Sequence, residues 1–290
     1  MIVYSNRSKV PVYTDYRDNI IIDRDHPILS WKANKDRMQP GWFSAEVRSN
    51  YPQGLPKIAS FHSEDALTWN VFRTLQQDNR VKCITDIFLP GFDTHKIYFW
   101  GHDADVQSEK IDADIQNSLN EIEPWGRDGR WQQTEPDLLL KSNDQIIMVE
   151  CKLGEPEAEV KAWQRSKPGM RSEYDDFIHT LEATPFKNVF DYNRDGNRFY
   201  QLFRNYLLGI SLALRWKTRF SLLAIVNDFN TNINGRSHLD EFSSFRSILT
   251  DPSNTYLISW QQIQGKLRNH EDLVSLTDYL SKHSFLKGAS

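Results

Sequence analysis

Two short apolar runs separated by three polar residues constrain the fold most strongly. The runs Leu138–Leu140 and Ile146–Val149 have the length and composition of buried β-strands. Between them, residues 142–144 (Ser-Asn-Asp) have the composition of a turn. The sequence therefore predicts a tight hairpin with strands over Pro136–Lys141 and Gln145–Leu153.

Three charged residues lie at the open end of this predicted hairpin. Side chains alternate between the faces of a strand, so Glu150 and Lys152 project from the same face. Asp137 lies near the start of the partner strand, and pairing of the two strands brings it close to Glu150. Cys151 is expected to point the other way, into the apolar layer with Met148 or its neighbours.

This arrangement of charges predicts a metal site. Two neighbouring carboxylates repel each other unless a cation joins them, and oxygen ligands suit Mg²⁺ or Mn²⁺. The metal lowers the pKa of a bound water and neutralises charge on a phosphate. Lys152 orients that water or stabilises the developing negative charge, and the backbone carbonyl of Cys151 is a further ligand. The chemistry that follows is phosphodiester hydrolysis.

The motif has a known counterpart. Pro136-Asp137, followed by Glu150-Cys151-Lys152 thirteen positions after the aspartate, resembles the PD-(D/E)XK superfamily of restriction-endonuclease-like nucleases. The resemblance implies an α/β fold with a central mixed β-sheet flanked by helices. In that core the order is helix, three strands, helix and strand, with the motif on the second and third strands.

The remaining elements can be assigned to this order. A helix begins after the N-cap Ser63, and Leu67, Val71 and Leu75 mark its buried stripe. Later helices are predicted near 108–122, 174–181, 197–215 and 239–249, with two more at the C-terminal end. The other predicted strands are Ile20–Ile22, Cys83–Leu89, Lys96–Trp100, Phe220–Val226 and Tyr256–Trp260.

The resemblance also implies auxiliary residues on two helices. An acid on the first helix completes the metal site in many members, and Glu64 matches it by position. The alternative is that Glu64 only interacts with the helix dipole. A Gln or Tyr on the helix after the motif is a second feature, for which Gln201 and Tyr206 are candidates. Their spacing departs from the common form, and Gln201 is equally explained as a residue on the polar side of its helix.

The distribution of charge is compatible with a polyanionic substrate. Residues 101–160 hold fifteen acidic and five basic residues, whereas residues 161–220 hold six acidic and eleven basic ones. An acidic centre with basic flanks suits a site that binds a cation and then nucleic acid, although a patchy solvated surface gives the same pattern. The residues expected to contact phosphates are Lys161, Arg165, Lys167 and Arg171.

The sequence also predicts a domain division and a cellular setting. Residues 1–60 are expected to form an N-terminal extension packed on the core. The nuclease core spans 61–230, with 154–196 as an insertion or flap, and residues 231–290 form a C-terminal α/β extension. Two cysteines, no apolar signal core and no apolar stretch long enough to span a bilayer favour a cytoplasmic protein without a membrane partner.

Several interpretations of function remain. The resemblance implies a Mg²⁺- or Mn²⁺-dependent nuclease acting on DNA more than on RNA, in defence or repair, as a homodimer or with a partner protein. The alternative on the same fold is a catalytically inactive nucleic-acid-binding or scaffold protein. A third interpretation is a nucleotide-sugar transferase that uses Asp103 and Asp105. A further alternative is that the motif charges form only an ion-pair ladder on an exposed strand.

Overall fold

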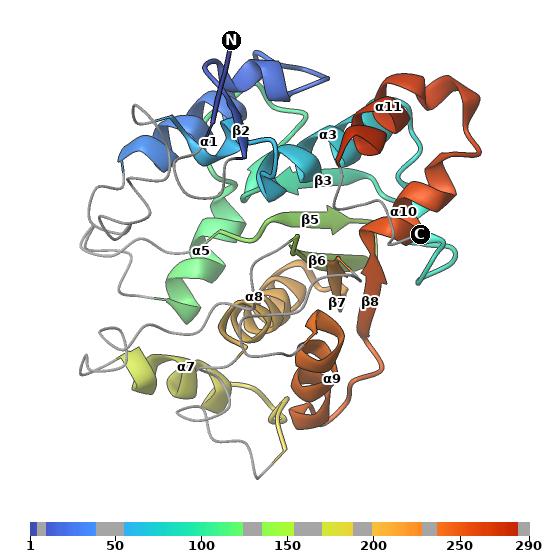
Figure 1. Ribbon diagram of the computed structural model, residues 1–290. Coiled ribbons are helices and arrows are strands. Elements are labelled where there is room, and N and C mark those ends of the chain that lie inside the picture. Colours follow the sequence, from blue (N-terminus) through green and yellow to red (C-terminus); the bar gives the residue numbers. More distant parts are fainter. Residues whose placement is uncertain are drawn as a thin grey trace.

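A six-stranded mixed sheet lies at the centre of the computed structural model (Figure 1). The structure describes residues 1–4, 10–38, 55–123, 135–153, 170–187, 199–227 and 237–283, with backbone alone at 36–38 and 170–173. In sheet order the strands are β4 (His102–Asp103), β3 (Lys96–Phe99), β5 (Leu138–Lys141), β6 (Gln145–Cys151), β7 (Arg219–Val226) and β8 (Thr255–Ser259). Neighbours from β4 to β6 are antiparallel, and those from β6 to β8 are parallel. The predicted α/β class with a mixed sheet is confirmed.

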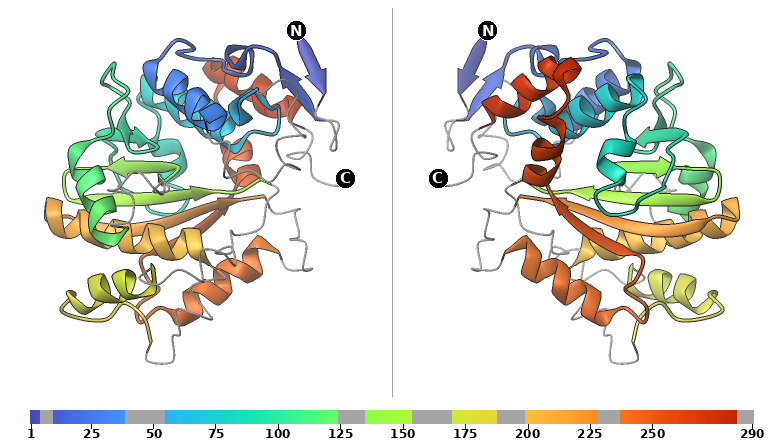
Figure 2. Two further views of the ribbon diagram at one scale, coloured as in Figure 1. Left: turned by 90° about the vertical axis from the view of Figure 1, so that its left-hand side faces the viewer. Right: turned by 90° about the vertical axis from the view of Figure 1, so that its right-hand side faces the viewer.

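Helices cover both faces of the sheet, as the side views show (Figure 2). One layer comprises α1 (Pro27–Met38), α3 (Glu64–Gln77), α4 (Lys82–Thr85), α10 (Trp260–Leu267) and α11 (Val274–Lys282). The other comprises α5 (Ala113–Ile122), α7 (Met170–His179), α8 (Tyr200–Trp216) and α9 (His238–Ile248). Each layer buries its own apolar cluster against the sheet, so the strands between them are apolar on both faces.

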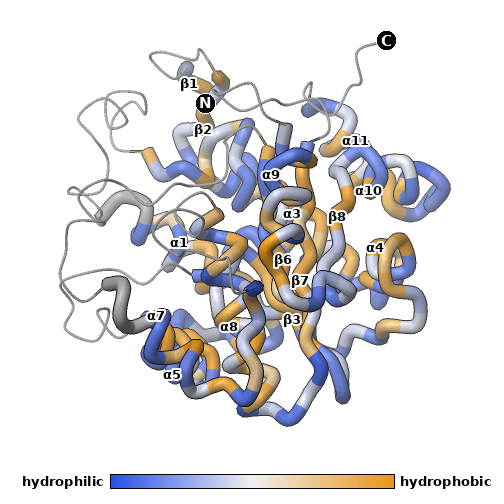
Figure 3. Tube along the Cα trace, turned by 90° about the horizontal axis from the view of Figure 1, so that it is seen from below, coloured by the Kyte–Doolittle hydropathy of each residue, from blue (hydrophilic) through white to orange (hydrophobic). Residues whose placement is uncertain are grey.

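Strand β6 supplies side chains to both clusters. Ile147, Val149 and Cys151 pack with the α3 layer, whereas Ile146 and Met148 pack with the α8 layer. Cys151 is buried in an apolar layer as expected, and that layer contains the neighbours of Met148 but not Met148 itself, because the two-residue period puts Cys151 on the face of Val149. Figure 3 shows apolar residues concentrated in the strands and on the helix faces turned toward them.

Most elements lie where the sequence predicts them, but two predicted strands are wrong. The segment Cys83–Leu89 contains the short helix α4 and turns. Val81 and Ile84 are buried three positions apart, which is a helical spacing. Ile20–Ile22 is also not a strand: Ile20 follows the 3₁₀ helix η1 (Tyr16–Asn19) and is fully buried.

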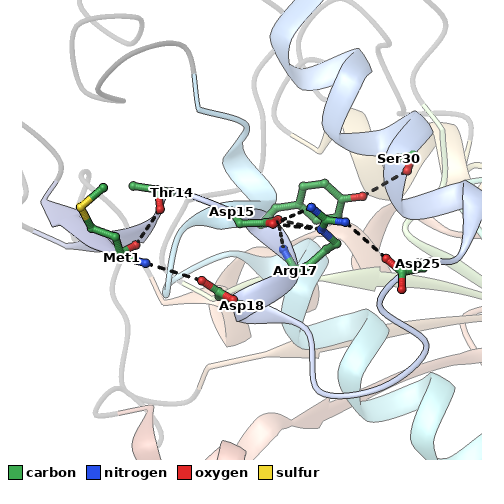
Figure 4. Close-up of polar contacts among 8 residues, drawn as sticks. Met1, Thr14, Asp15, Arg17, Asp18, Asp25 and Ser30 are labelled. Atoms are coloured by element: carbon green, nitrogen blue, oxygen red, sulfur yellow. Dashed lines mark hydrogen bonds and ion pairs between the residues drawn. The ribbon is translucent and has the colours of Figure 1, made fainter.

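The N-terminal residues pack against α3. Strands β1 (Ile2–Tyr4) and β2 (Pro11–Tyr13) form a separate antiparallel pair. Beyond them, Arg17 contacts Asp15 and Asp25 across a loop (Figure 4). Apolar side chains of α1 then enter the same cluster as Trp69 of α3. Among the described residues, no helix is long and apolar enough to cross a membrane.

Helix α8 approaches β7 closely at a glycine. A Cβ atom added to Gly209 would lie 2.0 Å from Cε2 of Phe220, much closer than real Cβ atoms approach a neighbour. Gly265 of α10 is also helical, but a Cβ atom there meets nothing within 4 Å. The two glycines thus differ in packing while sharing a helical backbone.

We predict opposite effects on stability for alanine at these two glycines. Gly209→Ala should lower the free energy of unfolding by about 1–3 kcal/mol, because the added methyl group forces Phe220 or α8 to move. Gly265→Ala should raise it by about 0.5–1 kcal/mol, because alanine loses less conformational entropy in a helix. Urea unfolding followed by circular dichroism measures both changes, and a stabilised Gly209→Ala variant would contradict the packing described.

Candidate functional site

The register of β5 and β6 brings Asp137 and Glu150 together. Leu138 lies opposite Val149 in this antiparallel pair, so the next residues outward, Asp137 and Glu150, also face each other. Lys152 follows two positions after Glu150 and projects from the same face of β6. The structure therefore brings together the three motif residues predicted from the sequence.

The Glu150 carboxylate is buried and held at both oxygens. Only 1% of Glu150 is exposed. Its Oε1 lies 2.7 Å from Nζ of Lys152, and its Oε2 accepts a 2.7 Å hydrogen bond from Nδ2 of Asn205. The backbone N–H of Lys152 donates to the carbonyl of Ile225 at 2.8 Å, which extends the pairing of β6 with β7. Both members of the ion pair are thus fixed by neighbouring elements.

Asp137 sits in an environment that disfavours its charge. Its Oδ2 accepts a 2.8 Å hydrogen bond from the backbone N–H of Cys151. Burial raises the pKa of Asp137 well above its ordinary value, and the negative charge of Glu150 raises it further, while Lys152 opposes the shift. The empty site therefore favours the neutral form of the Asp137 carboxyl.

Glu64 reaches the same end of β6 from the α3 layer. Ser63 caps α3 by accepting a hydrogen bond from the Ala66 N–H at 3.2 Å, so Glu64 is the first helical residue. Its Oε1 accepts a 2.7 Å hydrogen bond from the N–H of Leu153. Asp137 and Glu64 thus accept hydrogen bonds from the backbone N–H groups of Cys151 and Leu153, which lie two residues apart at the end of β6. The role of Glu64 as a metal ligand stays a prediction.

The donor set fits a cation such as Mg²⁺ or Mn²⁺. Such ions are bound through one or two carboxylates and keep several waters. Asp137 and Glu150 supply two facing carboxylates. Burial and then the charge of Glu150 raise the pKa of Asp137, and a cation between the two carboxylates would oppose both effects. Within the described ranges, no group of three or more His, Cys, Asp or Glu side chains is arranged to hold a metal ion.

Asn205 is a site residue that the sequence did not reveal. It lies on α8, the helix on which Gln201 and Tyr206 were expected to contribute. The structure does not bring Tyr206 to the site, because its ring packs on Phe220 and its hydroxyl faces Asn254 at 3.4 Å. Gln201 lies one helical turn before Asn205 on the same face, which is the signal that would have identified Asn205. The role of Gln201 stays a prediction.

The preceding residue, Arg204, is fully buried behind Asn205. Its Nε and Nη2 donate to Oδ1 of Asn205 at 3.2 and 2.8 Å. Its Nη2 also lies 3.4 Å from the backbone carbonyl of Glu135. The same guanidinium thus touches the segment that leads into Asp137 and the residue that holds Glu150.

A family model described as "Restriction Endonuclease associating with ARP" matches residues 51–283 of the chain. The chain belongs to this family. Comparisons with curated proteins and with solved structures gave no match. The matched range contains α3, both motif strands, α8 and β7, so the site lies wholly within the restriction-endonuclease family region.

An element outside the family region also adjoins the site. Helix α1 precedes residue 51, and its Lys35 forms an ion pair with Glu135, two residues before Asp137. Its Lys32 lies 3.3 Å from Oδ1 of Asp65, which also accepts a 2.8 Å hydrogen bond from Nε1 of Trp100. These contacts place positive charge from α1 beside the acidic centre of this endonuclease-family protein.

The structure describes the side chains of some of the remaining predicted residues and not of others. Lys161, Arg165 and Lys167 lie outside the described residues, and Arg171 lies in the part of α7 described by backbone alone. Asp103 is 2.7 Å from Nζ of Lys96, whereas Asp105 accepts from Nε2 of Gln76 at 3.0 Å. The two acids of the proposed transferase motif thus bind different partners.

We predict that neutralising Asp137 stabilises the metal-free protein. Folding raises the pKa of Asp137, so the folded state holds a proton that the unfolded state releases at lower pH. The free energy of unfolding therefore falls as the pH rises through the raised pKa. Asp137→Asn should therefore raise the melting temperature at pH 7.5 by about 2–4 °C. The gain should disappear near pH 4, where the wild-type carboxyl is also protonated. Thermal unfolding with a chelator present measures both values.

The control for this prediction is Asp144 at the opposite end of the hairpin. Its hydrogen bond with Arg219 lowers the pKa of Asp144, so its charge is favoured in the folded state. Asp144→Asn should leave the melting temperature unchanged or lower it slightly. Equal destabilisation by both variants at pH 7.5 would show that Asp137 is an ordinary structural carboxylate.

Proposed function

We propose that this chain is a divalent-metal-dependent nuclease that hydrolyses phosphodiester bonds of nucleic acid, DNA more than RNA. The observation that supports the proposal is the facing pair Asp137 and Glu150, with Lys152 ion-paired to Glu150. It occurs within the region matched by a restriction-endonuclease family. An ion-pair ladder on an exposed strand does not account for it, because Glu150 and Lys152 are buried.

Each motif residue has a part in the proposed reaction. The carboxylates of Asp137 and Glu150 and the backbone carbonyl of Cys151 would hold Mg²⁺ or Mn²⁺, with Glu64 as an auxiliary ligand. When bound, such an ion lowers the pKa of a water and neutralises charge on the phosphate. Nζ of Lys152, held 2.7 Å from Oε1 of Glu150, donates to the attacking water or to a phosphate oxygen.

The family description bears on partners. It names association with ARP, and we propose that this chain likewise works with a partner protein in a larger cytoplasmic system, in defence against foreign DNA or in repair. Cleavage of both strands of a duplex in one binding event needs two such sites, which a homodimer would supply. Both assemblies are measurable by size-exclusion chromatography with light scattering.

We predict that Lys152→Met abolishes most cleavage. The purified chain should be incubated with Mg²⁺ or Mn²⁺ and supercoiled plasmid, linear duplex, single-stranded DNA or RNA. Losing a donor aimed at developing charge should lower the cleavage rate by about 10²–10³-fold, and EDTA should remove it. Comparison of the supercoiled and linear substrates separates endonuclease from exonuclease activity.

Lys141→Met is the matched control for this experiment. Lys141 lies at the other end of the same hairpin, where its Nζ sits 3.7 Å from the ring centroid of Trp216. Its loss should leave cleavage unchanged. If folded wild-type protein cleaves no substrate, the alternative of an inactive nucleic-acid-binding protein gains support. Equal activity of wild type and Lys152→Met would refute the proposed site.

A further inference from the structure

A line of buried polar side chains extends from the site into α8 and beyond. Glu150, Asn205 and Arg204 are each 1% exposed or less. Leaving such groups in an apolar interior is costly unless each is hydrogen-bonded. The contacts within this line therefore constrain where each side chain can lie.

The guanidinium of Arg204 fixes the orientation of the Asn205 amide. A guanidinium carries donors only, so the Asn205 atom that contacts Nε and Nη2 must be the carbonyl oxygen, Oδ1. The amide nitrogen is then directed to Oε2 of Glu150, to which it donates at 2.7 Å. Arg204 and Glu150 thus select the same orientation of the amide from its two ends.

The same guanidinium also contacts the segment that leads into Asp137, the other carboxylate of the site. Nη2 of Arg204 lies 3.4 Å from the carbonyl oxygen of Glu135, which precedes Asp137 by two residues. Arg204 is thus linked to β6 through Asn205 and directly to the segment that precedes β5. Arg204 therefore connects the backbone near Asp137 with the side chain that holds Glu150.

Two buried carboxylates favour the charge of Arg204: Glu123, and Glu150 of the site. Glu123 is fully buried at the end of α5 and favours the charged guanidinium. Oε1 of Glu123 accepts hydrogen bonds from the hydroxyls of Tyr174 and Tyr200 at 2.6 and 2.9 Å. Glu123 therefore stabilises the positive charge of Arg204 without competing for Asn205.

We propose that Arg204 and Asn205 are a positioning pair for the metal site. They hold Glu150 so that Oε1 stays with Lys152 and the carboxylate keeps its distance from Asp137. Neither residue touches substrate in this scheme, because both act through Glu150 and the Glu135 backbone. This inference rests on the proposed function, since the cation is what the fixed spacing serves.

The variants for the test are Asn205→Ala and Arg204→Lys, with Asn70→Ala as a matched control. Lysine keeps the positive charge near Glu123 but lacks the planar fork that orients the amide. Asn70 is likewise a buried helical asparagine, yet its amide bonds the backbone N–H of Ile21 and the carbonyl of Asn19. Its loss should cost stability without affecting the site.

The first measurement needs no metal. Urea midpoints of the full chain should be determined for Asn205→Ala, Glu150→Gln and their double variant, and likewise for Asn70→Ala with Glu150→Gln. A positioning contact predicts non-additive midpoint shifts for the Asn205 cycle and additive shifts for the Asn70 cycle. Additive shifts in both cycles would overturn the pair on structural grounds alone.

The second measurement is Mn²⁺ binding by calorimetry, with Mn²⁺ alone as the ligand. Loss of a group that orients a metal ligand typically costs about 10–100-fold in affinity, and we expect this for Asn205→Ala. Arg204→Lys should show a smaller loss in the same direction and serves as the test variant if Asn205→Ala fails to fold. Asn70→Ala should bind Mn²⁺ like the wild type.

The outcomes separate the two ideas. Wild-type affinity for Mn²⁺ in both Asn205→Ala and Arg204→Lys would overturn the positioning role while leaving the nuclease proposal intact. Absence of Mn²⁺ binding by the wild type would overturn the proposed function and, with it, the role of the pair in holding a cation. Selective loss in the Asn205 and Arg204 variants, together with non-additive midpoints, would establish the pair.

Discussion

The hydrogen bonds that close the β5–β6 hairpin set the positions of both motif carboxylates. Ser142 donates its N–H to the carbonyl of Gln145 at 2.8 Å, and its Oγ accepts from the Gln145 N–H at 3.0 Å. From this turn the register runs outward until Asp137 faces Glu150. A slip of one residue would turn Glu150 to the α3 face and separate the carboxylates. The turn thus sets the geometry of the candidate site at the far end of the strands.

The parallel pairing of β6 with β7 explains why support for Glu150 comes from α8. Parallel neighbours need a crossover connection, which must cover one face of the sheet. Here that connection includes α8, on the face toward which Glu150 points, so Asn205 can reach the carboxylate. The position of the supporting residue therefore follows from strand direction, even though its identity does not.

The parts of the fold that sequence predicts are those with strong local patterns. The motif strands are short apolar runs separated by turn residues, α3 and α8 have helical periods, and the structure contains all of them. Cys83–Leu89 failed because an apolar run of that length is compatible with a strand and with a short helix. Tyr206 was misplaced because residues five apart on a helix point about 140° apart, whereas Gln201 and Asn205, four apart, share a face. Contacts between distant segments, such as Lys35 with Glu135, have no local pattern to reveal them.

Burial of the polar and charged side chains at the site costs free energy and changes their chemical behaviour. Apolar residues in place of Arg204, Asn205 and Glu150 would serve a purely structural core at least as well. The two apolar clusters on either side of the sheet supply the stability that offsets the burial of these groups. The same low-dielectric surroundings that raise the pKa of Asp137 also strengthen the interaction of Lys152 with any negative charge that reaches it. The surroundings that disfavour the Asp137 charge in the empty site would therefore also favour a cation placed between the two carboxylates.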